Sequence, residues 1–325
     1  MLKNKEKIKI GNTPMIKIDY RYKEDKGSIF AKLEYFNITG SIKDRIAYYI
    51  INNERKKGLL KENMPIVEAT SGNTGISLAA LGAYYKHPVF IFMPDWASIE
   101  RVKLMKSYGA KVILISKEEG GFIRCVEEAK KMAKENNYFY ANQFANEDNF
   151  LAHYETTGKE ILNKLKDIKI GGFVSGVGTG GTLMGIGTKV KEKYKDLKIT
   201  AIEPDKMPLI SEKEIKGKHK IEGIGDDFVP KLLDKNKIDK IILINDDDAI
   251  NMSRKLAKKL GLGVGISSGA NFLGSVLLEN EIKESVVTIF TDDSKKYLST
   301  DLFKDIDIDE RSISNKIELL DYNFI

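Results

Sequence analysis

Cysteine and histidine are scarce in this chain of 325 residues, which contains one Cys and three His. Cys125 has no second cysteine with which to form an internal disulfide, and His87, His153 and His219 are too scattered to complete a zinc cluster with it. We therefore expect no metal site and no redox chemistry. Cys125 lies within a helical pattern, where it is expected to fill space in the core or at the surface.

Long apolar runs are also absent. No stretch approaches the ~20 residues that a membrane-spanning helix needs. The N-terminal residues 1–14 lack the apolar core of a signal peptide. These absences predict a cytoplasmic protein that does not bind membranes.

Neither sign of charge dominates, because 53 Lys and Arg face 47 Asp and Glu. The resulting net charge of +6 is spread through mixed-sign stretches such as residues 53–57, which we interpret as solvated helix faces and not as a nucleic-acid surface. The hydrophobic fraction of 42% is that of an ordinary globular protein and excludes disordered and collagen-like classes. The length indicates one large or two medium domains.

Short apolar runs alternate with amphipathic stretches, the pattern of an α/β protein with mainly parallel sheets. Strands are predicted at 65–69, 89–93, 111–115, 138–143, 173–177, 198–203, 240–244 and 286–290. Helices are predicted at 41–57, 75–85, 98–108, 122–136, 149–165, 181–194, 247–260, 268–279 and 296–303. Residues 304–325 show neither the helix period nor the strand period and are interpreted as a docking arm or a ragged tail.

Three glycine-rich turns each stand where a predicted strand ends and a predicted helix begins. They read TSGNTG at 70–75, GVGTGGT at 176–182 and GISSG at 265–269. In open α/β sheets, ligands bind at the carboxyl ends of strands, where helix N-termini present free backbone N–H groups to anions. Three such turns predict a ligand with several anionic or polar ends.

The middle turn also fits the dinucleotide pattern G-x-G-x-x-G, through Gly176, Gly178 and Gly181. Glu203 ends the next predicted strand, where a dinucleotide site keeps the acid that binds a ribose. A nicotinamide enzyme is therefore an alternative. Against it, Thr179 and Thr182 supply hydroxyls suited to a terminal phosphate, and a dehydrogenase does not account for the turn at 70–75.

Lys43 is the most informative residue outside these turns. Ser41 and Asp44 flank it in the pattern of a capping box, which predicts that Lys43 lies in the first turn of a helix. A cation there opposes the helix dipole, so its amine should lose a proton more readily than that of a surface lysine. Such an amine suits a Schiff-base nucleophile that also carries protons.

Short segments spread from residue 11 to about residue 300 carry a family resemblance. They read GNTP (11–14), AKLEYFN (31–37), SIKDR (41–45), TSGNTG (70–75), GTGGT (178–182), EGIG (222–225), GISSG (265–269) and YLST (297–300). In this order they resemble the cysteine synthase and cystathionine β-synthase family of pyridoxal-phosphate enzymes. Several motifs in one order are far more specific than any single motif, so the nicotinamide alternative loses its support.

The resemblance implies roles for the matched residues. Lys43 would hold pyridoxal 5'-phosphate as an imine, and Asn73 would hydrogen-bond the hydroxyl of its ring. The cofactor phosphate would lie against Gly178, Thr179, Gly180, Gly181 and Thr182. The substrate carboxylate would bind Thr70, Ser71, Gly72, Thr74 and Gln143. Ser268, in preference to its neighbour Ser267, would face the pyridine nitrogen, and a neutral hydroxyl there favours β-elimination over transamination.

The resemblance also implies a reaction and an architecture. The amine of Lys43 would remove the α-proton of an L-amino acid, the β-substituent would leave, and a nucleophile would add to the remaining aminoacrylate. O-acetylserine, serine and cysteine are the expected substrates. We expect the two-domain fold-type II architecture, with a smaller domain at 37–148 and a larger one formed by 1–36 with 149–325. Members of this family are usually homodimers.

The segment after residue 225 departs from the family pattern. Cysteine synthases usually carry small uncharged residues there and cystathionine β-synthases commonly Tyr-Asp, whereas this chain has Asp226 and Asp227. A carboxylate ~4 Å from an incoming hydrosulfide anion would oppose it by up to ~4 kcal/mol at an effective dielectric near 20, yet it would accept a proton from water or a thiol. We therefore favour release of sulfide from L-cysteine with addition of water or a thiol, giving L-serine or a thioether. Two solvated loop acids in an ordinary cysteine synthase remain the alternative.

Other departures concern the substrate side. Trp96 replaces smaller residues and either narrows the entrance or packs on the surface. Residues 291–294, Thr-Asp-Asp-Ser, replace a turn that contains Pro and Gly. A catalytically idle relative that binds the C-terminal peptide of a partner in the same cleft is a further hypothesis.

Overall fold

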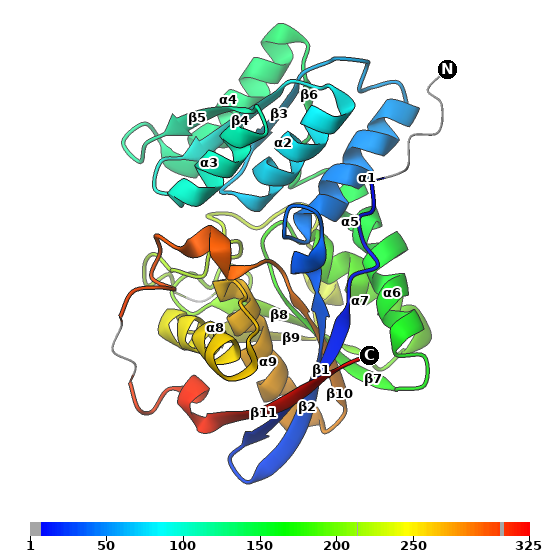
Figure 1. Cartoon of the computed structure of the whole chain (residues 1–325), viewed down its shortest axis with the longest axis vertical. Helices are drawn as coiled ribbons and strands as arrows, with labels where there is room; N and C mark the ends of the chain where they lie inside the picture. The colour runs from blue at the N-terminus through cyan, green and yellow to red at the C-terminus, as the bar shows by residue number, and fades with distance from the viewer. Residues whose placement is uncertain (1–7, 213, 306–308) are drawn as a thin grey trace.

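The computed structural model describes residues 8–212, 214–305 and 309–325, and two sheets organise them (Figure 1). A four-stranded sheet has the order β5-β4-β3-β6, and all of its pairs are parallel. Its strands are β3 (Ile66–Ala69), β4 (Val89–Pro94), β5 (Lys111–Ile115) and β6 (Phe139–Tyr140). Helix α1 (Lys43–Lys56), α2 (Asn73–Tyr85) and α3 (Ile99–Ser107) pack on one face, and α4 (Gly121–Asn136) packs on the other.

A seven-stranded sheet has the order β11-β1-β2-β10-β7-β8-β9. Its strands are β1 (Met15–Tyr22), β2 (Asp25–Leu33), β7 (Ile170–Gly176), β8 (Lys198–Pro204), β9 (Lys240–Ile244), β10 (Ser285–Phe290) and β11 (Ile317–Phe324). Helices α8 (Asp246–Leu260) and α9 (Ile266–Ile282) cover one face, while α6 (Gly158–Lys164) and α7 (Gly181–Lys193) cover the other. Both faces of both sheets are buried, which explains why their central strands read as continuous apolar runs. The predicted α/β class is confirmed.

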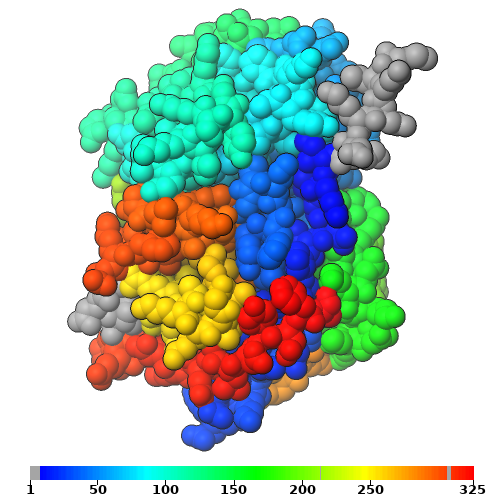
Figure 2. Space-filling model, viewed as in Figure 1, coloured from blue at the N-terminus to red at the C-terminus, as the bar shows by residue number. Residues whose placement is uncertain are grey.

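Three strands were not predicted from the sequence. β1, β2 and β11 form the antiparallel edge of the larger sheet, with β1 between the other two. Residues 317–324, expected to lie in a docking arm or a ragged tail, are instead the strand β11, whose Ile317 and Leu319 are buried. Figure 2 shows this C-terminal segment lying against α8. Only the short alternation Ile-Glu-Leu marks it in the sequence, and the strand's partner lies about 300 residues earlier.

Several helix predictions are wrong in detail. The stretch 149–165 is not one helix, because α5 (Glu147–Ala152) and α6 are joined by a π-helix at His153–Thr157. The stretch 296–303 contains only the end of a 3₁₀ turn, Ser294–Tyr297. The strand expected at 138–143 is reduced to two residues, because Asn142 adopts the left-handed conformation at φ 54°.

The capping box expected at the start of α1 is not formed. The helix begins at Lys43, and Ile42 at its N-cap makes no side-chain capping bond. Asp44 instead accepts hydrogen bonds from the N–H and the hydroxyl of Thr39, at 2.7 and 2.5 Å. The Asp44 carboxylate therefore stabilises the preceding turn, and the position of Lys43 in the first helical turn is nevertheless as predicted.

A matched pair of substitutions tests whether β11 belongs to the core. Ile317→Ala is expected to lower the free energy of unfolding by about 2–5 kcal/mol, because it removes a buried side chain. Leu320→Ala on the same strand removes a side chain that is 38% exposed and should change it by less than about 1 kcal/mol. Denaturant unfolding measures both, and equal effects would contradict the placement of this strand.

Candidate active site

One cavity brings together most of the predicted site residues. Its wall contains Lys43, Thr70, Ser71, Gly72, Asn73, Thr74, Gln143, Gly178, Thr179, Gly180, Thr182, Asp226 and Ser267. The turn at 70–74 follows β3 of the small sheet, and the loop at 178–182 follows β7 of the large sheet. The carboxyl ends of strands from both sheets thus face one space, as the sequence pattern predicts.

Three predicted residues lie outside this wall. Gly181 opens α7, where an added Cβ would meet the side-chain oxygen of Asn149 at 2.0 Å. Ser268 is fully buried and accepts a hydrogen bond from the backbone N–H of Thr291 at 3.0 Å. Ser267, ranked second from the sequence, is the serine on the cavity wall. Consecutive residues of a helix point about 100° apart, so only one of the two can face the cavity.

Asp227, the third of these residues, lines an outer cavity that shares part of its wall with the inner one. Asp226 lines both cavities. Trp96 lines the outer cavity with 53% of its surface exposed, and the amine of Lys218 lies 5.3 Å from the centre of its ring. The indole thus stands at the entrance and not in the core.

Lys43 and Asp226 influence each other's protonation across the inner cavity. Burial lowers the pKa of the Lys43 amine, against the opposing effect of the Asp226 and Asp292 carboxylates. The direction of this pKa shift agrees with the sequence prediction, but its main cause is burial and not the helix dipole. Burial also raises the pKa of Asp226 to about 6, with Lys43 lowering it and Asp227 raising it. The cavity therefore holds an amine that loses its proton readily and a carboxylate that is weakly basic.

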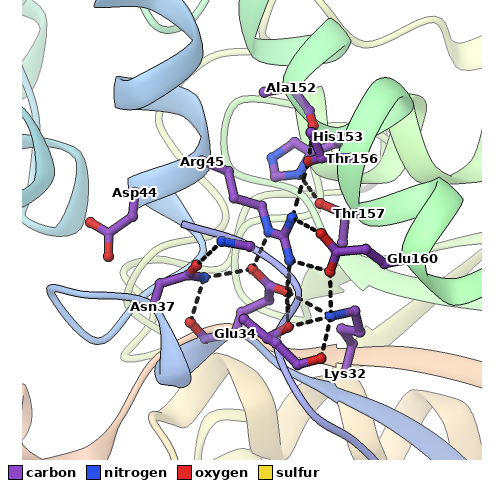
Figure 3. Close-up of polar contacts among 12 residues, drawn as sticks. Lys32, Glu34, Asn37, Asp44, Arg45, Ala152, His153, Thr156, Thr157 and Glu160 are labelled. Carbon is purple, nitrogen blue, oxygen red and sulfur yellow. Dashed lines mark hydrogen bonds and ion pairs between the residues drawn. The ribbon is translucent and has the colours of Figure 1, made fainter. Parts of the chain in front are cut away.

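A buried ion cluster fixes α1, and with it Lys43, to the large sheet (Figure 3). Arg45, two residues after Lys43, pairs with Glu34 at 2.6 Å and with Glu160 at 2.7 Å. Lys32 on β2 pairs with the same Glu160 at 2.7 Å. Burial is the largest single influence and works to raise the pKa of Glu34, but Arg45, Lys32 and Thr13 together lower it to about 2. The Glu34 carboxylate therefore stays ionised, and paired with Arg45, at neutral pH.

The turn at 70–74 presents backbone donors to the cavity. Gly72 precedes α2 without a side-chain capping bond, so N–H groups of the first helical turn are available to an anion. The hydroxyl of Thr74 donates to the side-chain oxygen of Gln143 at 2.6 Å, and the Gln143 amide donates to the carbonyl of Ala69 at 2.9 Å. Gln143 thus holds the turn at 70–74 in place through these two hydrogen bonds.

Sequence reasoning missed Arg101, which also lies on the wall. Arg101 on α3 pairs with Glu222, and its guanidinium lies 4.5 Å from the centre of the Tyr297 ring. The Tyr297 hydroxyl and the Asn73 amide both donate to the same oxygen of Asp292, each at 2.7 Å. These contacts join α3, α2 and the turn after β10 around the cavity. No local motif marks Arg101, because its partners are distant in sequence.

The cavity wall fits both ends of pyridoxal phosphate, the ring with its hydroxyl and the phosphate. The side-chain oxygen of Asn73 is buried without a partner among the described residues, as expected of a group that awaits a ring hydroxyl. A Cβ on Gly178 would meet the carbonyl oxygen of Gly223 at 2.6 Å, and Gly180 has a φ of 84°, so the loop needs glycine at both positions. Beyond the loop, α7 offers its N-terminus to a phosphate.

Two other candidates from the sequence are placed elsewhere. Glu203 does not line the cavity, and its carboxylate accepts hydrogen bonds from the N–H groups of Ile210 and Ser211, so it does not await a ribose. Cys125 is buried in the core between α4 and the small sheet, where burial raises the pKa of its thiol to about 12. Within the described part of the chain, no helix is long and apolar enough to cross a membrane.

Comparisons with known proteins agree with this geometry. Residues 7–292 match the family model of the pyridoxal-phosphate dependent enzymes. The chain belongs to this family. It is 39% identical over 296 residues to a cysteine synthase of Staphylococcus aureus, covering 90% of this chain and 95% of the relative. It is 42% identical to cysteine synthase B of Campylobacter jejuni, covering 90% and 96%.

Solved structures extend the likeness. A hydrogen sulfide-producing enzyme from Fusobacterium nucleatum superimposes with a TM-score of 0.94 at 48% identity, covering 97% of this chain and 96% of that one. An Asp-to-Asn mutant of that enzyme, with a TM-score of 0.93 at 49% identity and covering 96% and 95%, is described in complex with an α-aminoacrylate intermediate. These relatives support a pyridoxal-phosphate-dependent β-replacement enzyme of the cysteine synthase family, so the hypothesis of an idle peptide-binding relative is not carried further.

The electrostatic coupling in the cavity predicts opposite shifts from two substitutions. In the ligand-free protein, the Asp226 carboxyl should titrate near pH 6. Lys43→Ala removes a cation that favours the carboxylate and should raise this pKa, whereas Asp227→Asn removes a like charge and should lower it. NMR titration of the carboxyl carbon measures both, and shifts of the same sign would contradict the arrangement.

Proposed function

We propose that this enzyme releases hydrogen sulfide from L-cysteine and adds water at Cβ, which forms L-serine, or adds a thiol, which forms a thioether. The observation that carries the proposal is the position of Asp226, a carboxylate on the wall of the cavity that contains Lys43. Bound pyridoxal phosphate supplies an electron sink that makes the α-proton of an amino acid acidic and allows the β-substituent to leave.

Lys43 would hold the cofactor and serve as the proton carrier. Burial lowers the pKa of its amine, which favours the neutral form that accepts the α-proton. Asn73 would hold the ring hydroxyl, the loop at 178–182 would hold the phosphate, and Ser267 is the hydroxyl that reaches the cavity near the start of α9. Ser268 lies behind it and would support the turn at Thr291.

The substrate carboxylate would bind at the turn 70–74. The free N–H groups at the start of α2 supply donors, and Gln143 keeps the turn in place through Thr74. Arg101 packs directly against Gly72, where a Cβ would meet its side chain at 2.3 Å. This contact leaves no room for a side chain at position 72, which is why glycine is needed there.

Asp226 would select the nucleophile. Its pKa of about 6 keeps the carboxylate largely ionised at neutral pH, so it repels hydrosulfide and accepts a proton from a neutral water or thiol. Asp227, on the wall of the outer cavity, would reinforce the negative potential on the path of entry. The names of the Fusobacterium relatives and the Asp-to-Asn complex of one of them support this direction.

The second candidate is cysteine synthesis from O-acetylserine and sulfide. The names of the Staphylococcus and Campylobacter relatives favour it, and the residues that would bind the cofactor and the substrate carboxylate serve both reactions. The two candidates differ in the residue that meets the nucleophile. Asp226 is the group on which the choice between them depends.

The division into domains, the homodimer and the location also stay within this proposal. We propose a smaller domain at 37–148 and a larger one formed by 1–36 with 149–325, supported by the four strands of the small sheet, which all lie between residues 66 and 140. A homodimer is proposed from the family resemblance, and a cytoplasmic location from the sequence features described above. Size-exclusion chromatography with light scattering tests the dimer.

Product analysis distinguishes the two reactions. The protein with bound cofactor is incubated with L-cysteine alone and, separately, with O-acetylserine plus sulfide, and the amino acids formed are identified. We expect L-serine and hydrogen sulfide from cysteine alone at a rate above that of cysteine synthesis. Cysteine synthesis with no serine formed from cysteine would establish the second candidate instead.

Two substitutions then test the role of the aspartates. Asp226→Asn should slow sulfide release from cysteine by roughly 10²-fold or more, the usual contribution of a general base, with unchanged visible absorbance of the bound cofactor. Asp227→Asn, beside it on the wall of the outer cavity, should have a smaller effect. Unaltered turnover in both variants would refute the role assigned to this pair.

A further inference from the structure

Two buried side chains stand directly behind the loop at 178–182. Asn149 on α5 and His153 at the start of the π-helix are four residues apart and are both fully buried. The amide nitrogen of Asn149 lies 2.8 Å from the hydroxyl of Thr179, and the Nε2 atom of His153 lies 3.2 Å from the hydroxyl of Thr182. Each threonine on the cavity wall thus has a polar partner on the side away from the cavity.

The direction of the Asn149 bond is fixed by its second contact. The same amide nitrogen lies 2.8 Å from the backbone carbonyl of Gln143, which can only accept. The nitrogen is therefore the donor in both bonds. Because the Thr179 hydroxyl accepts the bond from Asn149 on the side away from the cavity, its own proton is free to point into the cavity.

His153 is a neutral imidazole. Burial, with the cations of Arg45 and Lys43, lowers its pKa to about 3. Figure 3 shows its ring between the side chains of Arg45 and Thr157. One ring nitrogen therefore donates and the other accepts, and the partners decide which.

The hydroxyl of Thr157 decides the tautomer. Thr157 is fully buried, and Nδ1 of His153, at 3.1 Å, is the only hydrogen-bond partner of its hydroxyl within the described part of the chain. If Nδ1 carried the proton, the hydroxyl proton of Thr157 would be buried without an acceptor, which is costly. If Thr157 donates to Nδ1, the proton of His153 is on Nε2 and is donated to Thr182, so the Thr157 hydroxyl and both ring nitrogens of His153 have partners.

We infer that His153, with Asn149, is a positioning residue that turns the hydroxyl protons of the loop threonines toward a phosphate in the cavity. The inference rests on the proposed placement of the cofactor phosphate at 178–182. In the opposite tautomer Thr182 would present its lone pairs to the phosphate and repel it. The Asn149 amide and the His153 imidazole thus leave the hydroxyl protons of Thr179 and Thr182 free to face an anion.

The π-helix supplies the required geometry. The hydroxyl of Thr156 donates to the carbonyl of Ala152, and the N–H of Gly158 reaches the carbonyl of His153. Side-chain competition for helix carbonyls opens the turn, and single π-turns are frequent at functional sites. The wider turn carries both the imidazole and the Thr157 hydroxyl that orients it.

A comparison of five variants tests the inference, with two readouts for each. The readouts are the dissociation constant of pyridoxal phosphate and the ³¹P chemical shift of the phosphate in the holoenzyme. His153→Leu removes a hydrogen bond that strengthens a donor to a charged group, so it should weaken cofactor binding roughly 10- to 100-fold and move the shift. Thr182→Val should do the same.

The double variant His153→Leu/Thr182→Val should bind no more weakly than Thr182→Val alone, because His153 acts through that hydroxyl. Tyr154→Phe, in the same π-helix, removes a hydroxyl that bonds Glu192 at the surface and not the imidazole, so it is the matched control and should bind the cofactor as the unaltered protein does. Additive losses in the double variant would overturn the inference, as would an unchanged dissociation constant for His153→Leu.

Thr157→Val keeps the imidazole and removes only the hydroxyl that selects its tautomer. It should weaken cofactor binding and move the ³¹P shift in the same direction as His153→Leu, and it serves if His153→Leu does not fold. Unchanged values for Thr157→Val would overturn the assignment of the tautomer. Unchanged values for Thr182→Val would instead show that the phosphate lies elsewhere, which refutes the proposed placement of the cofactor.

Discussion

The buried ion pairs of Arg45 are the constraint on which the site depends. Lys43 begins α1, a helix that packs with the small sheet, whereas the loop at 178–182 follows a strand of the large sheet. Arg45 joins the two layers by binding Glu34, just after β2, and Glu160 on α6. Removal of one partner of a buried ion pair leaves the other charge uncompensated and costs about 3–5 kcal/mol. The Arg45 ion pairs thus fix the position of the Lys43 amine relative to the loop at 178–182.

The same arrangement explains how two opposing demands on charge are met. The cavity needs an amine that releases its proton, and burial provides it by disfavouring the cation of Lys43. It also needs a carboxylate that stays ionised although partly buried, and Lys43 across the cavity lowers the pKa of Asp226 against the effect of burial. Each group thus tunes the other. In the proposed function, a carboxylate in this position favours water or a thiol over hydrosulfide as the nucleophile.

Local sequence patterns predicted much of the fold and most of the cavity wall. The glycine-rich turns were recognisable because glycine is required where backbone groups approach closely, as Gly178 does to the carbonyl of Gly223. Lys43 was recognisable from its place in the first turn of a helix. β1 and its hairpin partner β2 were missed although β1 alternates apolar and charged residues from Ile16 to Tyr22. β11 was missed because its partner β1 lies about 300 residues earlier in the chain.

The sequence by itself determined the class of fold, the family and the chemical types present at the site, because each depends on short segments whose spacing follows helix and strand geometry. Only the tertiary structure decided which serine after residue 265 faces the cavity, which aspartate lies nearer the amine, and which side chains stand behind the loop at 178–182. Those choices depend on the direction in which a side chain points and on partners far away in the chain. Asn149 and His153 illustrate the reason, since their relation to Thr179 and Thr182 exists only once α5 and α7 pack together.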